Sequence, residues 1–334
     1  MAALPDFLCP TLQASDEALE AAQERRKRAY LGMSAIGGAC ERALWYGFRW
    51  AALSAFDATT LKRFADGHAS EAVVISRLKA TPGLEVHDTD ESGEQFGFKA
   101  LGGHFSGHMD GVVLGLVQAP KTWHVLEVKA SEKWTDLDKA RKKVGEKGAL
   151  AEWNATYYAQ AVLYMDFAGL DRHYLVCTSP GARRWTAVRT NADPVFAQIL
   201  KDKAERIIFR DDAPQRIGGP ESFACRWCDS KGICHEGDAP ERNCRTCLSA
   251  EVLREIVPGV GNWKCIQHGH GLSKSDQERG CPSHRFLPSL VPGDQVDADD
   301  HGVTYRMPDG SYWVDAGPET QSEITLTDEK ETTT

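Results

Sequence analysis

The chain has 334 residues, of which 42% are hydrophobic and 26% are charged, and its formal net charge is −9. This length suits one large domain and one small one, since a domain typically has roughly 100–200 residues. The sequence has no apolar run near the ~20 residues that cross a bilayer. Its first residues, Met-Ala-Ala-Leu-Pro-Asp, lack the basic and apolar segments of a secretory signal. We therefore expect a cytoplasmic protein without membrane association.

The acidic balance comes from the C-terminal end of the chain. Residues 289–334 hold 11 of the 48 acidic and 2 of the 39 basic residues, which leaves 37 of each sign in residues 1–288. Two basic clusters stand out in this neutral part, at residues 25–28 and 139–147. Such clusters could follow the phosphate backbone of a nucleic acid, and solvated helix faces are the alternative interpretation.

Helices are predicted for the N-terminal part of the chain. Residues 14–30 are expected to form a charged helix, and a second helix carries Cys40, Arg42 and an aromatic face after the break at Ser34-Ala-Ile-Gly-Gly. A third helix around residues 60–80 ends at Thr81-Pro82-Gly83, because proline and glycine terminate helices.

The middle of the chain alternates predicted strands with predicted helices. A helix is expected over 149–168, which has no internal glycine or proline, and an amphipathic one over 193–210. This order indicates an α/β or α+β core, with a mixed sheet flanked by helices. The predicted strands are Phe96–Leu101, His104–Leu114, Trp123–Ala130, 172–178 and 184–190.

The character of the sequence changes after Phe223, where segments become short, rich in cysteine and weakly periodic as far as Pro288. A hairpin is predicted beyond it, with strands at 303–306 and 312–314 joined across Pro308-Asp-Gly310. The polar residues 325–334 are expected to be disordered.

An acidic centre is predicted on two neighbouring strands. Glu127 and Lys129 are separated by one residue in a strand, so their side chains share one face. Asp110 lies in the preceding strand, and pairing of the two strands can place it beside Glu127. Two carboxylates in this arrangement suit a hard divalent cation such as Mg²⁺. A nearby lysine can orient or deprotonate a water and offset the charge of a phosphate, as phosphodiester hydrolysis requires.

The triplet of acid, any residue and lysine is weak by itself, since Asp229-Ser-Lys231 is another in this chain. Its order with other residues is more specific. Glu71, Asp110, Glu127-x-Lys129 and Gln160-x-x-x-Tyr164 resemble the motif series of the RecB/AddB-like branch of the PD-(D/E)XK nucleases. That branch includes CRISPR-associated and phage exonucleases with an iron–sulfur cluster. The matching segment covers about residues 30–235.

The resemblance implies a role for each matching residue. Asp110, Glu127 and Glu71 would bind Mg²⁺ or Mn²⁺, with the backbone carbonyl of Val128 as a further ligand, and Lys129 would assist the attacking water. Gln160 and Tyr164 would contact DNA or support the active site.

The chain departs from the family pattern at two positions. Met109 replaces the proline before the aspartate, and Glu71 stands where many relatives have a histidine. His68 competes with Glu71 for that role.

Ten cysteines in a chain without an export signal indicate metal binding rather than disulfides. Cys225, Cys228 and Cys234 form one closely spaced set. The iron–sulfur nucleases that the chain resembles have one further cysteine before the nuclease motifs, which corresponds to Cys40. The four would hold a 4Fe–4S cluster that ties the ends of the nuclease domain together. The alternative is a local zinc site in which His235 replaces Cys40.

A second set predicts a small zinc-binding module. Cys244, Cys247, Cys265 and Cys281 are the favoured ligands, with His284 and then His268 as substitutes. About 50 residues bury too little apolar area to fold unaided, so a bound metal would stabilise such a module. Cys177 lies in a strand-like run and is expected to be a core residue.

These features predict an N-terminal helix (1–30), a nuclease domain with an iron–sulfur cluster (31–236), a zinc module (237–290) and a hairpin with an acidic tail (291–334). The predicted activity is Mg²⁺- or Mn²⁺-dependent hydrolysis of DNA, as an exonuclease in recombination, replication or repair, of phage or bacterial origin. DNA, either single-stranded or as duplex ends, is the expected partner, with a recombination or replication protein as a second one. The alternatives are a non-catalytic DNA-binding or scaffold protein held by two metal centres, and a redox-sensing regulator.

Overall fold

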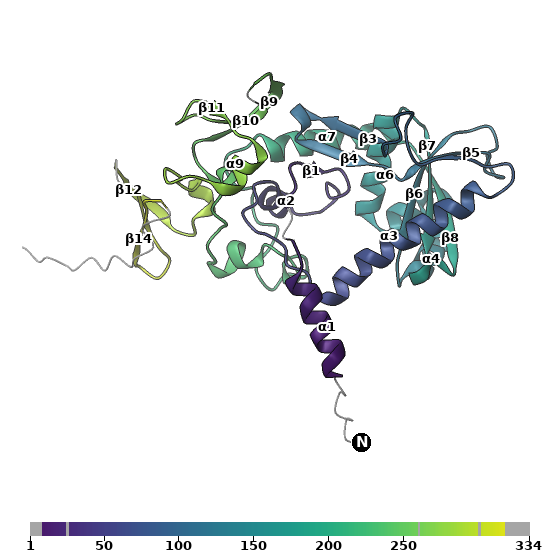
Figure 1. The fold of residues 1–334 in the computed structure, drawn as a ribbon, viewed down its shortest axis with the longest axis horizontal. Helices are drawn as coiled ribbons and strands as arrows, with labels where there is room; N and C mark the ends of the chain where they lie inside the picture. The colour runs from purple at the N-terminus through teal and green to yellow at the C-terminus, as the bar shows by residue number, and fades with distance from the viewer. Residues whose placement is uncertain (1–8, 25–26, 260, 300–301, 318–334) are drawn as a thin grey trace, which may run out of the picture.

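The computed structural model describes residues 9–24, 27–259, 261–299 and 302–317 (Figure 1). The predicted disordered tail, and Arg25 and Arg26 of the first basic cluster, lie outside the described residues. The helices are α1 (Pro10–Ala21), α2 (Glu41–Phe48), α3 (Ala58–Lys79), α4 (Trp134–Val144), α5 (Ala149–Trp153), α6 (Ala155–Ala168), α7 (Pro194–Ile208), α8 (Phe223–Arg226) and α9 (Lys274–Arg279). The strands are β1 (Leu31–Gly32), β2 (Glu85–His87), β3 (Gly97–Ala100), β4 (Phe105–His108), β5 (Gly111–Leu114), β6 (His124–Ala130), β7 (Arg172–Thr178), β8 (Trp185–Asn191), β9 (Ala250–Val257), β10 (Gly261–Cys265), β11 (His270–Gly271), β12 (Asp294–Ala298), β13 (Val303–Arg306) and β14 (Tyr312–Asp315).

The central element is a five-stranded mixed sheet in the order β2-β5-β6-β7-β8. Strands β6 and β7 are parallel, and the other neighbours are antiparallel. A parallel pair needs a long crossover connection, and here α4, α5 and α6 form it. The mixed α/β core predicted from the sequence is therefore confirmed.

Helices cover both faces of this sheet (Figure 1). On one face, Val74 and Leu78 of α3 pack with Leu126 and Val128 of β6. The other face packs against the crossover helices, and its buried residues include Leu137, Ala161, Leu175 and Cys177. Alternation along β6 explains this division, because consecutive strand residues point to opposite faces. The expectation that Cys177 is a core residue is confirmed.

The predicted strand His104–Leu114 is wrong as one element. It divides into β4 and β5, which belong to different sheets: β4 pairs with β1 and β3, and β5 pairs with β2 and β6. The break falls at Met109 and Asp110, immediately before Gly111, whose φ is 155°. A side chain at residue 111 would collide with the backbone oxygen of His87, so glycine allows this close approach.

Two predicted helices also differ from the structure. The helix expected over 149–168 is broken at Asn154, whose backbone is extended and whose side chain caps α6 by accepting from the amides of Thr156 and Tyr157. The helix expected over 14–30 ends at Ala21 instead, and Leu31 already belongs to a strand. Helices α2, α3 and α7 lie where the sequence places them.

The cysteine-rich segment and the C-terminal hairpin each form a three-stranded sheet, β11-β10-β9 and β12-β13-β14. The predicted hairpin is confirmed, since Tyr305 pairs with Trp313. Trp263, Cys247 and Phe286 belong to the same buried cluster as Trp45 and Phe48 of α2. The cysteine-rich segment therefore packs into the core of the preceding residues. Within the described residues, none of the helices combines the length and apolar character needed to cross a membrane.

Arg245 connects the cysteine-rich segment to the N-terminal part of the chain. Its fully buried guanidinium donates to the backbone oxygens of Phe48 and Ala29, at 3.0 and 2.8 Å, and to Oε1 of Gln277 at 2.8 Å. It also lies 3.8 Å from the ring centroid of Trp50. Burial, and then the nearby Arg49, lower the pKa of Arg245 to about 9.

Replacing Arg245 with methionine should strongly destabilise the fold. The substitution leaves the buried oxygens of Phe48 and Gln277 and the partly buried oxygen of Ala29 without this donor, and we expect a loss of about 3 kcal/mol in the free energy of unfolding. Urea denaturation of the two proteins measures this difference. Arg63→Met is the matched control, because Arg63 forms an exposed ion pair with Glu132 and its loss should change stability by less than about 1 kcal/mol. Equal stabilities of the two variants would contradict the structural role of Arg245.

Candidate active site and cysteine clusters

Asp110, Glu127 and Lys129 lie close together. Asp110 stands between β4 and β5, and the other two residues lie in β6. Gly111 pairs with Leu126 across the antiparallel β5 and β6, which brings Asp110 next to the last residues of β6. Asp110 Oδ2 accepts from the backbone amide of Val128 at 2.8 Å. The Lys129 ammonium forms an ion pair with Glu127 Oε1. The neighbouring positions that the strand pattern predicts are thus present in the structure.

Helix α3 brings two further titratable side chains to this centre. Glu71 lies close enough to Asp110 that, after burial, the repulsion between the two carboxyls helps to raise the pKa of Glu71 to about 7. Burial raises the pKa of Asp110, and His68, which is exposed and lies on the same helix as Glu71, is near enough to lower that pKa slightly. The two residues are three positions apart on one helix face. The structure therefore brings both competing residues to the centre.

Gln160 and Tyr164 lie on one side of α6, under the acidic centre. Gln160 Nε2 donates to Glu127 Oε1 at 2.9 Å. Tyr164 is buried, and burial raises its pKa above the ordinary value. A side chain at Gly107 would lie 3.0 Å from the Tyr164 hydroxyl, so β4 packs directly against this ring. Of the two roles considered for Tyr164, contact with DNA or support of the site, its burial at 2% exposure fits the second.

Burial determines the electrostatics of the centre. Burial and then Asp110 raise the pKa of Glu127 to about 8, and burial also raises the pKa of Asp110. Burial alone would lower the pKa of Lys129, but Glu127 and Asp110 outweigh it and raise that pKa. Three carboxyl groups face one ammonium, so the centre has an excess of acid. Glu127 Oε2 is buried and has no hydrogen-bond partner among the described residues. This oxygen and the excess of acid fit a bound divalent cation.

Tyr157 is a neighbour of the centre that the sequence motifs did not identify. Lys129 Nζ lies 5.2 Å from the centroid of the Tyr157 ring, which is one turn of α6 before Gln160. The signal in the sequence was the i, i+3 spacing of these two residues on one helix.

The first cysteine set lines one pocket. Cys40 caps α2 by accepting from the amide of Ala43, and it lines this pocket together with Cys225, Cys228 and Cys234. Burial raises the pKa of Cys228, and Cys40 and Cys234 raise it further. His235 lines the same pocket, and its buried Nε2 has no partner among the described residues. Both ligand sets considered from the sequence are thus close together.

The second cysteine set also converges. Burial raises the pKa of Cys244 to about 12, with further contributions from Cys247, Cys281 and Cys265. His268 Nε2 lies 3.8 Å from Cys281 Sγ. All ten cysteines of the chain are free thiols. As the side chains stand, no group of three or more histidine, cysteine, aspartate or glutamate residues in the described part of the chain could hold a metal ion.

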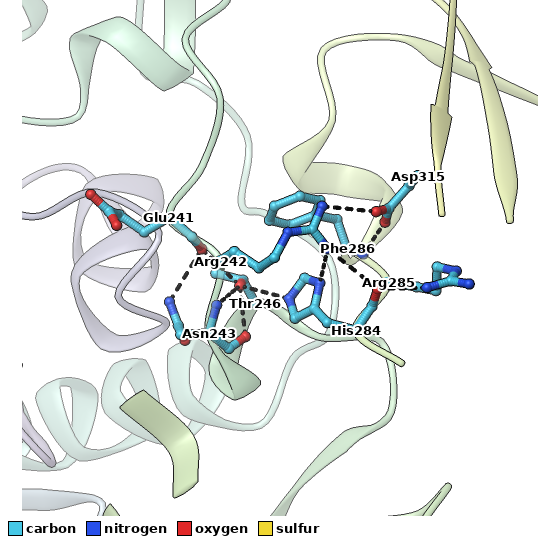
Figure 2. Close-up of polar contacts among 8 residues, drawn as sticks. All are labelled: Glu241, Arg242, Asn243, Thr246, His284, Arg285, Phe286 and Asp315. Carbon is cyan, nitrogen blue, oxygen red and sulfur yellow. Dashed lines mark hydrogen bonds and ion pairs between the residues drawn. The ribbon is translucent and has the colours of Figure 1, made fainter. Parts of the chain in front are cut away.

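His284 cannot serve as the substitute ligand in this conformation. Figure 2 shows its ring between Arg242 and Thr246. Arg242 donates to His284 Nδ1 at 2.8 Å, so Nε2 carries the proton and faces Thr246 Oγ1 at 3.2 Å. Arg242 is held in turn by Asp315 at 3.0 Å. Both ring nitrogens are occupied, which removes His284 from the zinc candidates and leaves His268.

Comparisons with known proteins give low similarities. No protein-family model and no curated protein matches the chain. A solved structure of SSO0001 is 15% identical with a TM-score of 0.36, and the match covers 67% of this chain and 95% of that one. An alkaline exonuclease from Laribacter hongkongensis is 15% identical with a TM-score of 0.38, over 57% and 90% of the two chains. A phage-related exonuclease from Haemophilus somnus is 18% identical with a TM-score of 0.31, over 44% and 69%. Similarities at this level carry no argument about the fold or the activity of this chain.

Acid should destabilise the protein through its buried histidines. Burial, and then Arg242, lower the pKa of His284 to about 4, and burial lowers that of His104 to about 4. Between pH 6.5 and 4 the unfolded chain binds protons that the folded chain does not, so the free energy of unfolding falls as the pH falls. The slope is at most about 1.4 kcal/mol per pH unit for each histidine.

Denaturation of wild type and His284→Asn at several pH values tests this expectation. The side-chain oxygen of an asparagine can accept the hydrogen bond from Arg242 and does not titrate. The free energy of unfolding of the variant should therefore change less steeply with pH than that of wild type, by the contribution of one proton. His87→Asn is the control, because the His87 side chain is 51% exposed. An unchanged slope in His284→Asn would show that His284 is not buried in the neutral form.

Proposed function

We propose that this chain is a divalent-cation-dependent nuclease that hydrolyses DNA, as in the PD-(D/E)XK nucleases that its motif series resembles. The observation that carries the proposal is the buried Glu127 oxygen without a partner, beside Asp110 and next to Lys129. Lys129 and Gln160 both contact the other oxygen of Glu127, and a buried carboxylate oxygen without a partner is costly unless it binds a further donor or a metal. Because three carboxyl groups face one ammonium, the centre would attract a divalent cation.

Each residue has a role that follows from its contacts. Asp110, Glu127, Glu71 and the carbonyl of Val128 would hold Mg²⁺ or Mn²⁺, with His68 as an alternative to Glu71. The bound cation would polarise the scissile phosphate and activate a water. Glu127, with a pKa of about 8, has to release its proton as the cation binds.

Lys129 acts through its charge. Its raised pKa keeps it an ammonium at neutral pH, so it donates to the water or to the phosphate and does not accept a proton. Gln160 fixes the orientation of Glu127 through its hydrogen bond.

The cysteines extend the proposal to two further metal centres. Cys40, Cys225, Cys228 and Cys234 would hold a 4Fe–4S cluster, since four thiols line one pocket. Zinc bound by the three later cysteines and His235 is the alternative. Cys244, Cys247, Cys265 and Cys281 would hold zinc, which prefers four thiolates in structural sites.

We extend the proposal to the kind of nuclease and its biological setting. By its resemblance the chain would be an exonuclease of phage or bacterial origin, acting in recombination, replication or repair beside a protein of that machinery. A non-catalytic DNA-binding scaffold is the second candidate function. A scaffold of this kind predicts that substitutions in the acidic centre do not change the release of nucleotides from DNA.

Glu127→Ala and Lys129→Ala should strongly decrease the rate of DNA hydrolysis. Loss of a metal-binding carboxylate removes several kcal/mol of transition-state stabilisation, so we expect a decrease of roughly a thousandfold for Glu127→Ala. Loss of one charged donor should decrease the rate roughly a hundredfold for Lys129→Ala. Release of end-labelled nucleotides from single- and double-stranded DNA, with Mn²⁺ or with EDTA, measures both.

Glu205→Ala is the control, because Glu205 is an exposed acid on α7 that pairs with Arg254. It should retain wild-type activity. Hydrolysis that persists in both active-site variants, or no hydrolysis by wild type with Mn²⁺, would refute the nuclease and favour the scaffold.

Protein purified without oxygen should contain about four iron atoms and one zinc ion per chain, with a brown colour. Cys225→Ser should lose iron and retain zinc, and Cys247→Ser should lose zinc and retain iron. Elemental analysis measures both metals. If the protein is colourless and contains two zinc ions, the first cysteine set holds zinc and not an iron–sulfur cluster. His284→Asn should retain the zinc of the second set.

A further inference from the structure

An open groove of about 510 Å³ lies beside the acidic centre. Its walls come from the segment after β6, from α4 and from the junction of α5 and α6. The residues used below are Lys133, Lys139, Lys143, Trp153, Asn154 and Tyr157, all of which line it. Its volume is within the roughly 300–1,000 Å³ that is usual for small-ligand sites.

One side chain links the groove to the surroundings of the acidic centre. Tyr157 lines the groove, and its ring lies 5.2 Å from Lys129 Nζ. A molecule that contacts Tyr157 in the groove would therefore lie within the width of one ring of Lys129. Lys133 follows β6 by three residues and lines the same groove.

One wall of the groove is aromatic. The half-buried rings of Trp153 and Tyr157 lie 5.6 Å apart and are inclined at 52°. Trp153 is the last residue of α5 and Tyr157 lies in the first turn of α6, on either side of the break at Asn154. The wall offers planar apolar surface on which a base can stack.

Lysines of α4 also line the groove, together with the acids Asp136 and Glu152. Lys139 and Lys143 are four positions apart on α4, so they share one face. Their side chains are 75% and 68% exposed, in ion pairs with Asp136 and Glu152. Exposed pairs of this kind contribute little energy, so a phosphate can replace either partner. The Lys133 ammonium has no ion-pair partner in the described part of the chain.

We propose that this groove binds an unpaired nucleotide of the DNA strand being cut, with its base on Trp153 and Tyr157 and its phosphate at the α4 lysines. The inference rests on the proposed nuclease function and specifies the form of its substrate. A base paired within a duplex is covered on both faces by its neighbours, so the aromatic wall is accessible only to a base outside the helix. The groove thus selects single strands and frayed ends over blunt duplex.

Fluorescence anisotropy with labelled DNA tests the proposal without cleavage. Wild type, Trp153→Ala and Tyr312→Ala are titrated onto a short single strand and onto a blunt duplex, with Ca²⁺ in place of Mn²⁺. Tyr312 is an exposed aromatic residue on β14 and serves as the control. Trp153→Ala should weaken single-strand binding roughly tenfold, the size of one lost base–aromatic stack, and leave duplex binding unchanged.

Lys143→Glu tests the α4 lysines with a variant that does not threaten the fold. It should weaken single-strand binding and reduce the slope of log Kd against log salt by about 0.7 or more. Lys274→Glu is its control, because Lys274 is 58% exposed and forms an ion pair with Glu278 on α9, at the other end of the molecule (Figure 1).

The outcomes separate this inference from the proposed function. Equal weakening of single-strand and duplex binding by Trp153→Ala would overturn the preference for an unpaired nucleotide. Unchanged single-strand binding in both Trp153→Ala and Lys143→Glu would overturn the groove as a site. A failure of the nuclease proposal appears elsewhere, as wild type that cleaves no DNA with Mn²⁺, whatever the binding results.

Discussion

The burial of two carboxyl groups beside a single lysine is the constraint on which the site depends. Asp110 and Glu127 are at most 9% exposed, and Glu71 adds a third acid. A buried charge is tolerated only when it is paired or neutralised. The Val128 amide donates to one oxygen of Asp110, and the Gln160 side chain and Lys129 both contact Oε1 of Glu127, which leaves Oε2 of Glu127 without a partner among the described residues.

Helix α6, which begins after the cap at Asn154, carries side chains to three places in the molecule. Its first turn carries Tyr157 to the groove, its second carries Gln160 to Glu127, and Tyr164 packs against β4 in the core. One rigid element thus fixes the distance between the groove and the acidic centre.

Helix α2 has a similar role for the cysteines. Cys40 caps its first turn, and the backbone oxygen of Phe48 at its end accepts from Arg245, which stands between Cys244 and Cys247. The two cysteine sets are therefore connected through eight helical residues and one buried guanidinium. The shared cluster around Trp263 makes the cysteine-rich segment a continuation of the core. Domain boundaries at residues 236 and 290 stay a prediction.

Much of the architecture could be predicted from the sequence, because period and spacing act locally. Strand alternation placed Glu127 and Lys129 on one face, and proline and glycine ended α3. Close spacing grouped Cys225, Cys228 and Cys234, whereas Cys40, which lines the same pocket, was added only through the family resemblance. Tertiary structure decided the rest: the division of β4 from β5, the break at Asn154, the exclusion of His284 and the groove beside Tyr157. These features depend on close approach between segments far apart in the chain, such as Gly111 against His87, and on buried partners that complete a side chain's hydrogen bonds. These partners come from distant segments that packing brings together, so the local pattern of residues does not predict them.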